Sequence, residues 1–180
     1  YVSDIVKDDK GFMWFATTKG LNRWDGYQFK FFFHEDNNDN SLSSNYINAV
    51  LFDKKGILWI ATTNGLNSYD PISGKFKLHY NITDEKNKIP SNYIYSLAED
   101  SNGNIWLGTE WGLKHFDTQT GKFYNYDFTE FINLPELNYK IIRKIFFDSD
   151  DNLWMSFSYS GLLKYNTKTK EKKFYLYDSE

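Results

Sequence analysis

The chain has 180 residues, enough for one domain with a sizeable core, and 41% of them are hydrophobic. The formal net charge is -3 with acidic and basic residues mixed, and the sequence shows no basic face or aromatic–basic cluster of the kind that binds nucleic acid. The absence of cysteine excludes disulfides, and no apolar run approaches the roughly 18–20 residues of a membrane-spanning helix.

In chain order, the sequence predicts short strands separated by tight turns. Residues 1–6 form the first expected strand, and an Asp-x-x-Gly turn follows, in which Asp can accept backbone N–H groups and Gly tolerates a positive φ. The second repeat shows the complete order, with strands expected at residues 47–52, 58–62, 66–70 and 75–80. The third repeat has its last strand at 122–126, and the fourth is expected to end with a strand at 174–177.

Four copies of one sequence unit account for this order. Each copy has an Asp-initiated turn followed by a tryptophan, and Trp14, Trp59, Trp106 and Trp154 recur at intervals of about 47 residues. Short strands at such a period are typical of β-propeller blades. A single four-stranded blade cannot bury both of its faces, so we expect the four tryptophans to lie between stacked blades.

The expected fold is therefore all-β: a β-propeller segment of four four-stranded antiparallel blades. The single propeller region covers residues 1–180, with blades at about residues 1–34, 46–80, 93–127 and 139–178. We expect these four blades to form a partial ring that other blades complete. Its apolar end faces would need a cover, either from neighbouring propeller blades or from a second copy in a homodimer.

The repeated pattern resembles the two-component regulator propeller repeat. Residues 53–70 and 100–117 fit that pattern closely, and residues 8–25 fit it with Trp24 in the aromatic position. The fourth copy departs from it, with Asp in place of Gly in the first turn and Phe157 in place of a threonine. The resemblance extends over essentially the whole chain.

The resemblance also implies a function. Such repeats form the extracytoplasmic sensor part of hybrid sensor histidine kinase–response regulators, many of which respond to breakdown products of complex glycans. A periplasmic, ligand-sensing segment of an inner-membrane protein is implied, one that binds an oligosaccharide or another small ligand and acts as a dimer. Kinase activity would reside in other parts of the parent protein. Those parts would also anchor this segment to the membrane. The segment itself is expected not to be an enzyme.

The candidate ligand-binding residues stand where the copies differ from one another. Strand directions place the blade-to-blade connections and the turns between second and third strands on one face of the propeller. The tips of those turns carry Lys19, Asn64, Glu110, Trp111 and Tyr159. The two aromatic rings are candidates to stack on the C–H face of a sugar, and the other three side chains to make polar contacts. Alternatively, Trp111 packs on a neighbouring loop or contacts a partner chain.

Three blade-to-blade connections end in Asn-Tyr, which adds Tyr46, Tyr93 and Tyr139 to the candidates. The dipeptide is either a recurring device for entering a strand or part of a ring of amides and aromatics around the channel mouth. Residues 100–104 and 148–152 look faintly like calcium loops, but they coincide with the first hairpin of a blade and lack the bidentate Glu. We therefore expect no metal, no cofactor and no catalytic residue.

Three hypotheses from different classes compete. The first is a ligand-sensing segment of a membrane-spanning regulator. The alternative is a protein–protein interaction or dimerisation scaffold without a small-molecule ligand, and the third is a propeller enzyme such as a polysaccharide lyase or hydrolase. The fold by itself does not decide between these hypotheses. Saturable ligand binding without turnover would support the sensor, and capture of a partner without ligand binding would support the scaffold. Turnover of a glycan would support the enzyme.

Overall fold

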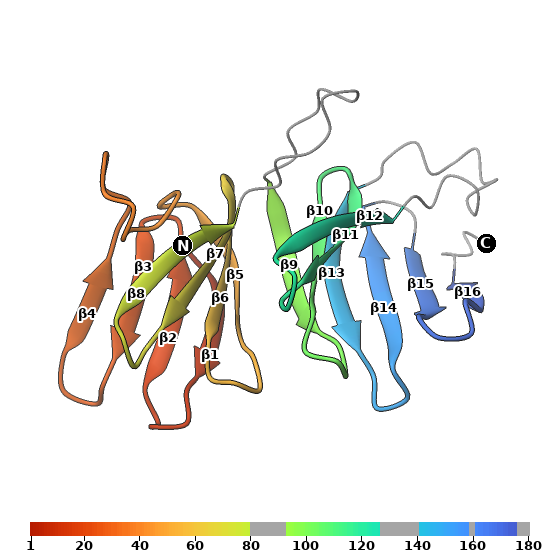
Figure 1. Ribbon diagram of the computed structural model, residues 1–180, viewed down its shortest axis with the longest axis horizontal. Helices are drawn as coiled ribbons and strands as arrows, with labels where there is room; N and C mark the ends of the chain where they lie inside the picture. Colours follow the sequence, from red (N-terminus) through yellow and green to blue (C-terminus); the bar gives the residue numbers. More distant parts are fainter. Residues whose placement is uncertain (80–92, 127–140, 159–160, 176–180) are drawn as a thin grey trace. The chain divides into compact units, whose positions relative to one another are not determined.

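The computed structural model describes residues 1–79, 93–126, 141–158 and 161–175. Their strands pair into four antiparallel sheets of four strands, and each sheet is made of strands that follow one another in the chain (Figure 1). The expected all-β architecture of four-stranded blades is thereby confirmed. The chain divides into two compact units, Tyr1–Ile94 and Tyr95–Glu180.

The first unit contains the first two blades. The first blade consists of β1 (Val2–Lys7), β2 (Met13–Thr17), β3 (Gly20–Trp24) and β4 (Phe29–Phe32). The second consists of β5 (Ile47–Phe52), β6 (Leu58–Thr62), β7 (Gly65–Asp70) and β8 (Lys75–His79). The strands of the second blade lie where the sequence predicts them, although β7 begins at Gly65, one residue earlier than expected.

The second unit contains the third and fourth blades. The third consists of β9 (Ile94–Glu99), β10 (Ile105–Thr109), β11 (Gly112–Asp117) and β12 (Lys122–Tyr126). The fourth consists of β13 (Ile142–Phe147), β14 (Asn152–Phe157), β15 (Gly161–Asn166) and β16 (Lys172–Tyr175). Strand β12 coincides with its prediction, whereas β16 begins at Lys172, earlier than the sequence suggests.

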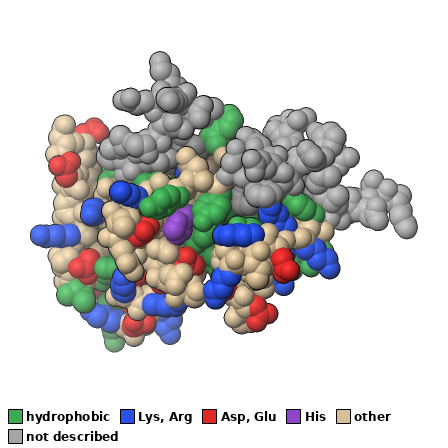
Figure 2. All heavy atoms as spheres, turned by 45° about the vertical axis from the view of Figure 1, so that its right-hand side comes forward, with side chains coloured by type: hydrophobic (Ala, Val, Ile, Leu, Met, Phe, Trp, Pro, Cys, Tyr) green, Lys and Arg blue, Asp and Glu red, His purple; other side chains and the backbone are tan. Residues whose placement is uncertain are grey.

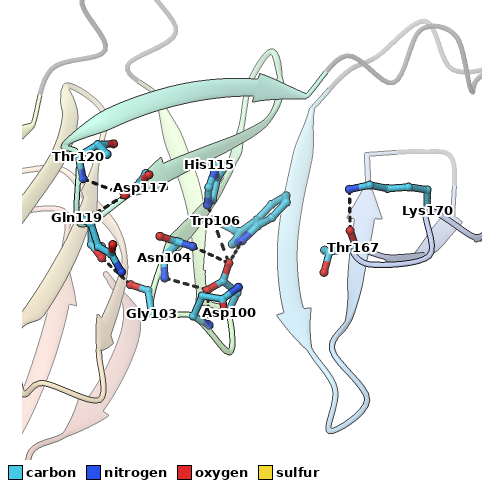
Figure 3. A network of polar contacts seen from close by, with 12 residues as sticks. Asp100, Gly103, Asn104, Trp106, His115, Asp117, Gln119, Thr120, Thr167 and Lys170 are labelled. Carbon is cyan, nitrogen blue, oxygen red and sulfur yellow. Dashed lines mark hydrogen bonds and ion pairs between the residues drawn. The ribbon is translucent and has the colours of Figure 1, made fainter.

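One hydrogen-bond network closes the first turn of each blade and explains why Asp and Trp recur together. In the third blade, Asp100 Oδ1 accepts the backbone N–H groups of Asn102 and Asn104, each at 2.9 Å. Its Oδ2 accepts the indole N–H of Trp106 at 3.0 Å (Figure 3). The same indole-to-carboxylate bond is found at 2.8–2.9 Å in the pairs Trp14–Asp8, Trp59–Asp53 and Trp154–Asp148. The carboxylate therefore ties the turn to the second strand of its own blade.

Tryptophans of the second strands form the contacts between blades within each unit. Trp14 is 0% exposed, and its ring centroid lies 5.5 Å from that of Tyr69 and 6.0 Å from that of Phe52, both in the second blade. In the second unit, the ring of Trp106 lies 5.8 Å from that of Phe147 in the fourth blade. The expected position between blades is confirmed for these two tryptophans.

A β-bulge interrupts the first strand of three blades near its start. The pairing of β1 with β2 shifts between Val2 and Asp4, so Ser3 is an extra residue without a partner across the ladder. The same shift makes Asn48 the extra residue of β5 and Arg143 that of β13. Bulges re-aim the side chain of the inserted residue. These three side chains therefore take directions that a regular strand would not give them.

The fourth blade replaces two repeated residues without losing the blade. Asp151 stands at the turn position where the other copies have Gly, and it adopts a φ of 60°, which Asp tolerates better than most residues. Phe157 stands where the second blade has Thr62, whose hydroxyl donates to the carbonyl of Gly65 at 2.9 Å. The Phe157 side chain is buried in the core between the third and fourth blades. A turn hydrogen bond is thus exchanged for apolar burial.

Acid sensitivity is expected from His79 at the end of β8. Burial, with a smaller effect of Lys77, lowers the pKa of the His79 imidazole from 6.5 to about 4. The unfolded chain therefore takes up a proton near pH 6.5 that the folded chain refuses until about pH 4, and stability falls as the pH drops through this window. We expect a loss of about 2 kcal/mol between pH 7 and pH 5 in urea unfolding. His79→Gln should remove most of that loss, and an unchanged pH dependence in this variant would contradict the assignment.

Candidate ligand-binding site

In the first unit, the connection between the two blades lies against turns of both blades. The backbone N–H of Gly20, in the β2–β3 turn, donates to the carbonyl of Asn45 at 2.8 Å. The side-chain amide of Asn64, in the β6–β7 turn, donates to the carbonyl of Ser43 at 3.2 Å. Both turns therefore share one face with the connection, as the strand directions predict.

Lys19, Asn64 and Tyr46 lie around this connection. Lys19 is exposed at the tip of the β2–β3 turn, and Asn64 is exposed at the tip of the β6–β7 turn. The ring of Tyr46 is exposed over 60% of its surface, while its carbonyl accepts the N–H of Thr63 at 3.1 Å. The structure thus brings three candidate side chains to one face of the first unit, with the Asn64 amide already engaged in holding the connection.

The first Asn-Tyr pair helps the chain to enter a strand. The side-chain oxygen of Asn45 accepts the backbone N–H of His34 at 2.7 Å, which closes the connection between β4 and β5. This contact favours the strand-entry interpretation for Asn45, and the exposed ring of Tyr46 keeps a surface that a ligand can reach. Tyr93, just before β9, is partly exposed. Tyr139 and Tyr159 lie outside the described residues.

Glu110 and Trp111 form the β10–β11 turn of the second unit. The backbone N–H of Trp111 donates to Thr109 Oγ1 at 3.2 Å, the same contact that Asn64 makes with Thr62 at 2.9 Å in the second blade. The turn is therefore built like its counterparts, and only its side chains differ. Half of the Trp111 side chain is exposed, at 50%, and Glu110 beside it is half-buried. A flat apolar ring and a carboxylate stand together at this tip.

A second group of side chains in this unit was not anticipated from the sequence. The guanidinium carbon of Arg143, the bulged residue of β13, lies 4.4 Å from the centre of the Tyr95 ring on β9. Arg143 Nε donates to Ser158 Oγ at 2.9 Å, in the turn that follows β14. The three residues come from the first strands of two blades and from the turn after a second strand. They form a cation–π contact held by a hydrogen bond, in which Arg143 is exposed and Tyr95 and Ser158 are partly buried.

A sequence signal for this group existed. The second residue of the first strand is Ser3, Asn48, Tyr95 and Arg143 in the four copies, whereas apolar residues recur at the position before it in all four. A position that differs in every copy of a repeat is a candidate for function rather than for architecture. The turn tips show the same variation, and the first strands carry it as well.

Two features are absent from the described residues: a cluster of metal-binding side chains and a helix that could span a membrane. Within them, no group of three or more His, Cys, Asp or Glu side chains is placed to hold a metal ion. No helix among them is long and apolar enough to cross a membrane. Figure 2 shows Lys and Arg side chains interspersed with Asp and Glu side chains over the described part of one face, in keeping with the mixed charge of the sequence.

Comparison with known sequences identifies the repeat. The sequence profile of the two-component regulator propeller matches residues 41–64 and 88–111. These two segments include the β6–β7 and β10–β11 turns that carry the candidates Asn64 and Trp111. No curated protein sequence matches the chain.

Solved structures agree with this assignment. The extracellular domain of BT3049, assigned as a hybrid two-component system of B. thetaiotaomicron, shares 26% identity and superposes with a TM-score of 0.81 over 98% of this chain and 24% of its own. The extracellular domain of BT4673 from the same organism shares 28% identity, with a TM-score of 0.77 over 96% of this chain and 24% of its own. The chain thus spans about a quarter of the length of these relatives.

A more distant likeness concerns the fold alone. A catalytically inactive virginiamycin B lyase from Staphylococcus aureus superposes with a TM-score of 0.72 over 98% of this chain and 55% of its own, at 16% identity. Identity this low carries no statement about activity. The sequence profile, the four blades and the extracellular-domain relatives agree with one another. The chain is a four-bladed β-propeller segment in which residues 41–64 and 88–111 match the two-component regulator propeller repeat.

Proposed function

We propose that the chain is a ligand-sensing, extracytoplasmic β-propeller segment of a hybrid two-component sensor histidine kinase. The observation that carries the proposal is the likeness, over 96–98% of the chain, to extracellular domains assigned to hybrid two-component systems. The propeller repeats found by the family profile support the same role. Kinase activity belongs to other parts of such a protein, and we propose a binding role without catalysis for this segment.

The ligand we propose is derived from a glycan. Support comes from the ring of Trp111, which is half exposed at a turn tip beside Glu110, on the face where the strand directions place the blade-to-blade connections. Stacking on an aromatic ring satisfies the C–H face of a sugar, and a carboxylate can accept hydrogen bonds from its hydroxyl groups. Lys19, Asn64 and Tyr46 offer polar and aromatic groups on the corresponding face of the first unit.

Thermal unfolding against a panel of oligosaccharides tests this function. A ligand at about 100 times its Kd should stabilise the folded chain by roughly 2.7 kcal/mol, a rise of roughly 5–10 °C in Tm. In Trp111→Ala we expect the rise to disappear while the Tm without ligand stays close to that of the wild type, because the ring is half exposed. The matched control is Tyr27→Ala, which removes an exposed ring from the β3–β4 turn at the other end of a blade and should keep the rise.

If an oligosaccharide still raises the Tm of Trp111→Ala, the sugar binds at a site that does not include Trp111. No rise with any sugar, in a folded sample, would favour the scaffold function instead. Turnover of an oligosaccharide by the pure chain would overturn both and support an enzyme.

A partly exposed apolar sheet face of the fourth blade favours the scaffold as the second candidate function. On the fourth blade, Phe146 and Leu162 are exposed beside Trp154, whose ring stacks on Tyr175. Trp154 corresponds to Trp14, which the next blade of the first unit buries completely. An exposed apolar sheet face of this kind is typical of an interaction surface. We propose that neighbouring propeller blades or a second copy of the chain cover it.

A further inference from the structure

Arg143 differs from its counterparts in how its side chain is used. Ser3 and Asn48 occupy the same bulged position in the first two blades. Both donate to backbone carbonyls of the first unit: Ser3 Oγ to those of Ala16 and Ile47, and the Asn48 amide to that of Ile94, the last residue of this unit, at 2.7 Å. In these copies the side chain of the bulged residue hydrogen-bonds to backbone carbonyls.

Arg143 instead contacts the preceding blade and its own turn. Its guanidinium lies over the ring of Tyr95, and its Nε donates to Ser158 Oγ at 2.9 Å. The guanidinium is therefore held near the Tyr95 ring, and one of its N–H groups is engaged. Among residues 95–126, 141–158 and 161–175, no carboxylate forms an ion pair with Arg143, and its two terminal nitrogens make no hydrogen bond. Its two terminal nitrogens therefore remain as donors on an exposed side chain.

The close approach of the two blades explains why Tyr95 and Arg143 can meet. Gly108 on β10 lies against β13, because a Cβ atom at this position would come within 2.9 Å of the Ile142 side chain and 3.0 Å of its carbonyl. Ile142 directly precedes Arg143. A small residue in β10 thus brings the start of β13 next to the third blade, and the bulge then turns Arg143 toward Tyr95.

We propose that Arg143 binds the carboxylate of a small acidic ligand, with Tyr95 and Ser158 as the residues that position its guanidinium. A planar guanidinium offers parallel N–H donors whose geometry matches the two oxygens of a carboxylate, and holding it near the Tyr95 ring lowers the ordering cost of binding. This inference rests on the proposed ligand-sensing function and names its ligand class, an acidic sugar.

Trp111 offers a contact for the ring of such a ligand, separate from the contact of its carboxylate with Arg143. The β10–β11 turn that carries Trp111 and the turn that carries Ser158 each follow the second strand of a blade, so they belong to the same end of the two blades of this unit. A sugar acid would place its ring on the tryptophan end and its carboxylate on Arg143. A simple carboxylate such as acetate has the carboxylate group but no sugar ring. Dependence of binding on Trp111 therefore distinguishes a sugar acid from a simple carboxylate.

The test is a titration of the whole chain with D-glucuronate, D-glucose and acetate at constant ionic strength, followed by NMR. We expect D-glucuronate to bind saturably and to shift the Arg143 Nε–Hε resonance. Arg143→Gln should weaken its binding about tenfold or more, because hydrogen bonds to a charged group are lost. Arg143→Lys should recover only part of the affinity, since a point charge cannot replace two parallel donors. The control Lys144→Gln removes a neighbouring charge and should change the affinity less than about threefold.

Each outcome separates this inference from the proposed function. Equal binding of D-glucuronate to wild type and a folded Arg143→Gln overturns the carboxylate site, and the sugar-sensing function stands if D-glucose still binds in a Trp111-dependent way. Acetate binding as tightly as D-glucuronate, with dependence on Arg143 but not on Trp111, keeps the carboxylate site and overturns the sugar-acid ligand. Absence of binding by all three probes at tens of millimolar overturns the inference as stated.

Discussion

Trp14→Ala is expected to lower the free energy of unfolding by about 3–5 kcal/mol, the range for removing a buried aromatic ring from a core. Trp14 is fully buried and packs against Phe32 of its own blade and against Phe52 and Tyr69 of the next. Its indole N–H is also the partner of the Asp8 carboxylate. The substitution therefore opens a cavity between two blades and leaves an acceptor without its donor. Urea unfolding followed by circular dichroism measures the loss, together with a fall of roughly 10 °C in Tm.

Two further variants separate the causes of this loss. Trp14→Phe keeps an aromatic ring but removes the indole N–H, and it should cost clearly less than Trp14→Ala. Trp111→Ala removes an equally large side chain that is half exposed, and we expect a change below about 1 kcal/mol. Equal losses in Trp14→Ala and Trp111→Ala would contradict the view that inter-blade packing by the repeated tryptophans stabilises the unit.

Asp53→Ala is expected to cost about 3 kcal/mol, because it removes the two carboxylate oxygens that accept three hydrogen bonds in a buried turn. Asp53 Oδ1 accepts the N–H groups of Lys55 and Ile57 at 2.9 and 3.0 Å, and Oδ2 accepts the indole N–H of Trp59 at 2.8 Å. Both Asp53 and Trp59 are buried, so water cannot fully replace the lost acceptor. Thermal and urea unfolding measure the effect.

The isosteric variant gives the sharper control. Asp53→Asn keeps one oxygen for the two backbone N–H groups but turns an N–H₂ group toward the indole N–H of Trp59. We expect it to retain part of the stability and to lose the bond to the indole. In a Trp59→Phe background the loss of stability caused by Asp53→Asn should shrink, since the donor is gone. An undiminished loss in that background would show that the indole bond contributes nothing.

The turns and strand positions could be predicted from the sequence because they depend on short-range chemistry. An aspartate followed two and four residues later by backbone N–H groups, and then by a tryptophan, contains every member of the network that closes the turn. The strands from β5 to β8 follow from the same local pattern, and four repetitions of it exclude a chance match. Even the fourth blade, with Asp151 at the glycine position, forms the same turn because Asp tolerates the required backbone conformation.

The candidate site could be predicted only in part. The turn tips that carry Lys19, Asn64 and Trp111 were recognised because they vary between copies, and the structure places them at turn tips. That the Asn64 amide is engaged with Ser43 depends on the path of a connection that no local pattern specifies. The alternatives for Trp111 are a sugar, a neighbouring loop and a partner chain, and none of these contacts is specified by the local pattern of the turn.

By itself, the sequence determined the all-β class, the four-stranded blade, the repeat pattern and the turns, since each depends on residues close together in the chain. Only the tertiary structure decided that Arg143 meets Tyr95 and Ser158. That contact requires a one-residue bulge in β13 and a close approach of two blades at Gly108. Ladder register and inter-blade distance are set by the packing of whole sheets, and the pattern of a single strand does not encode them.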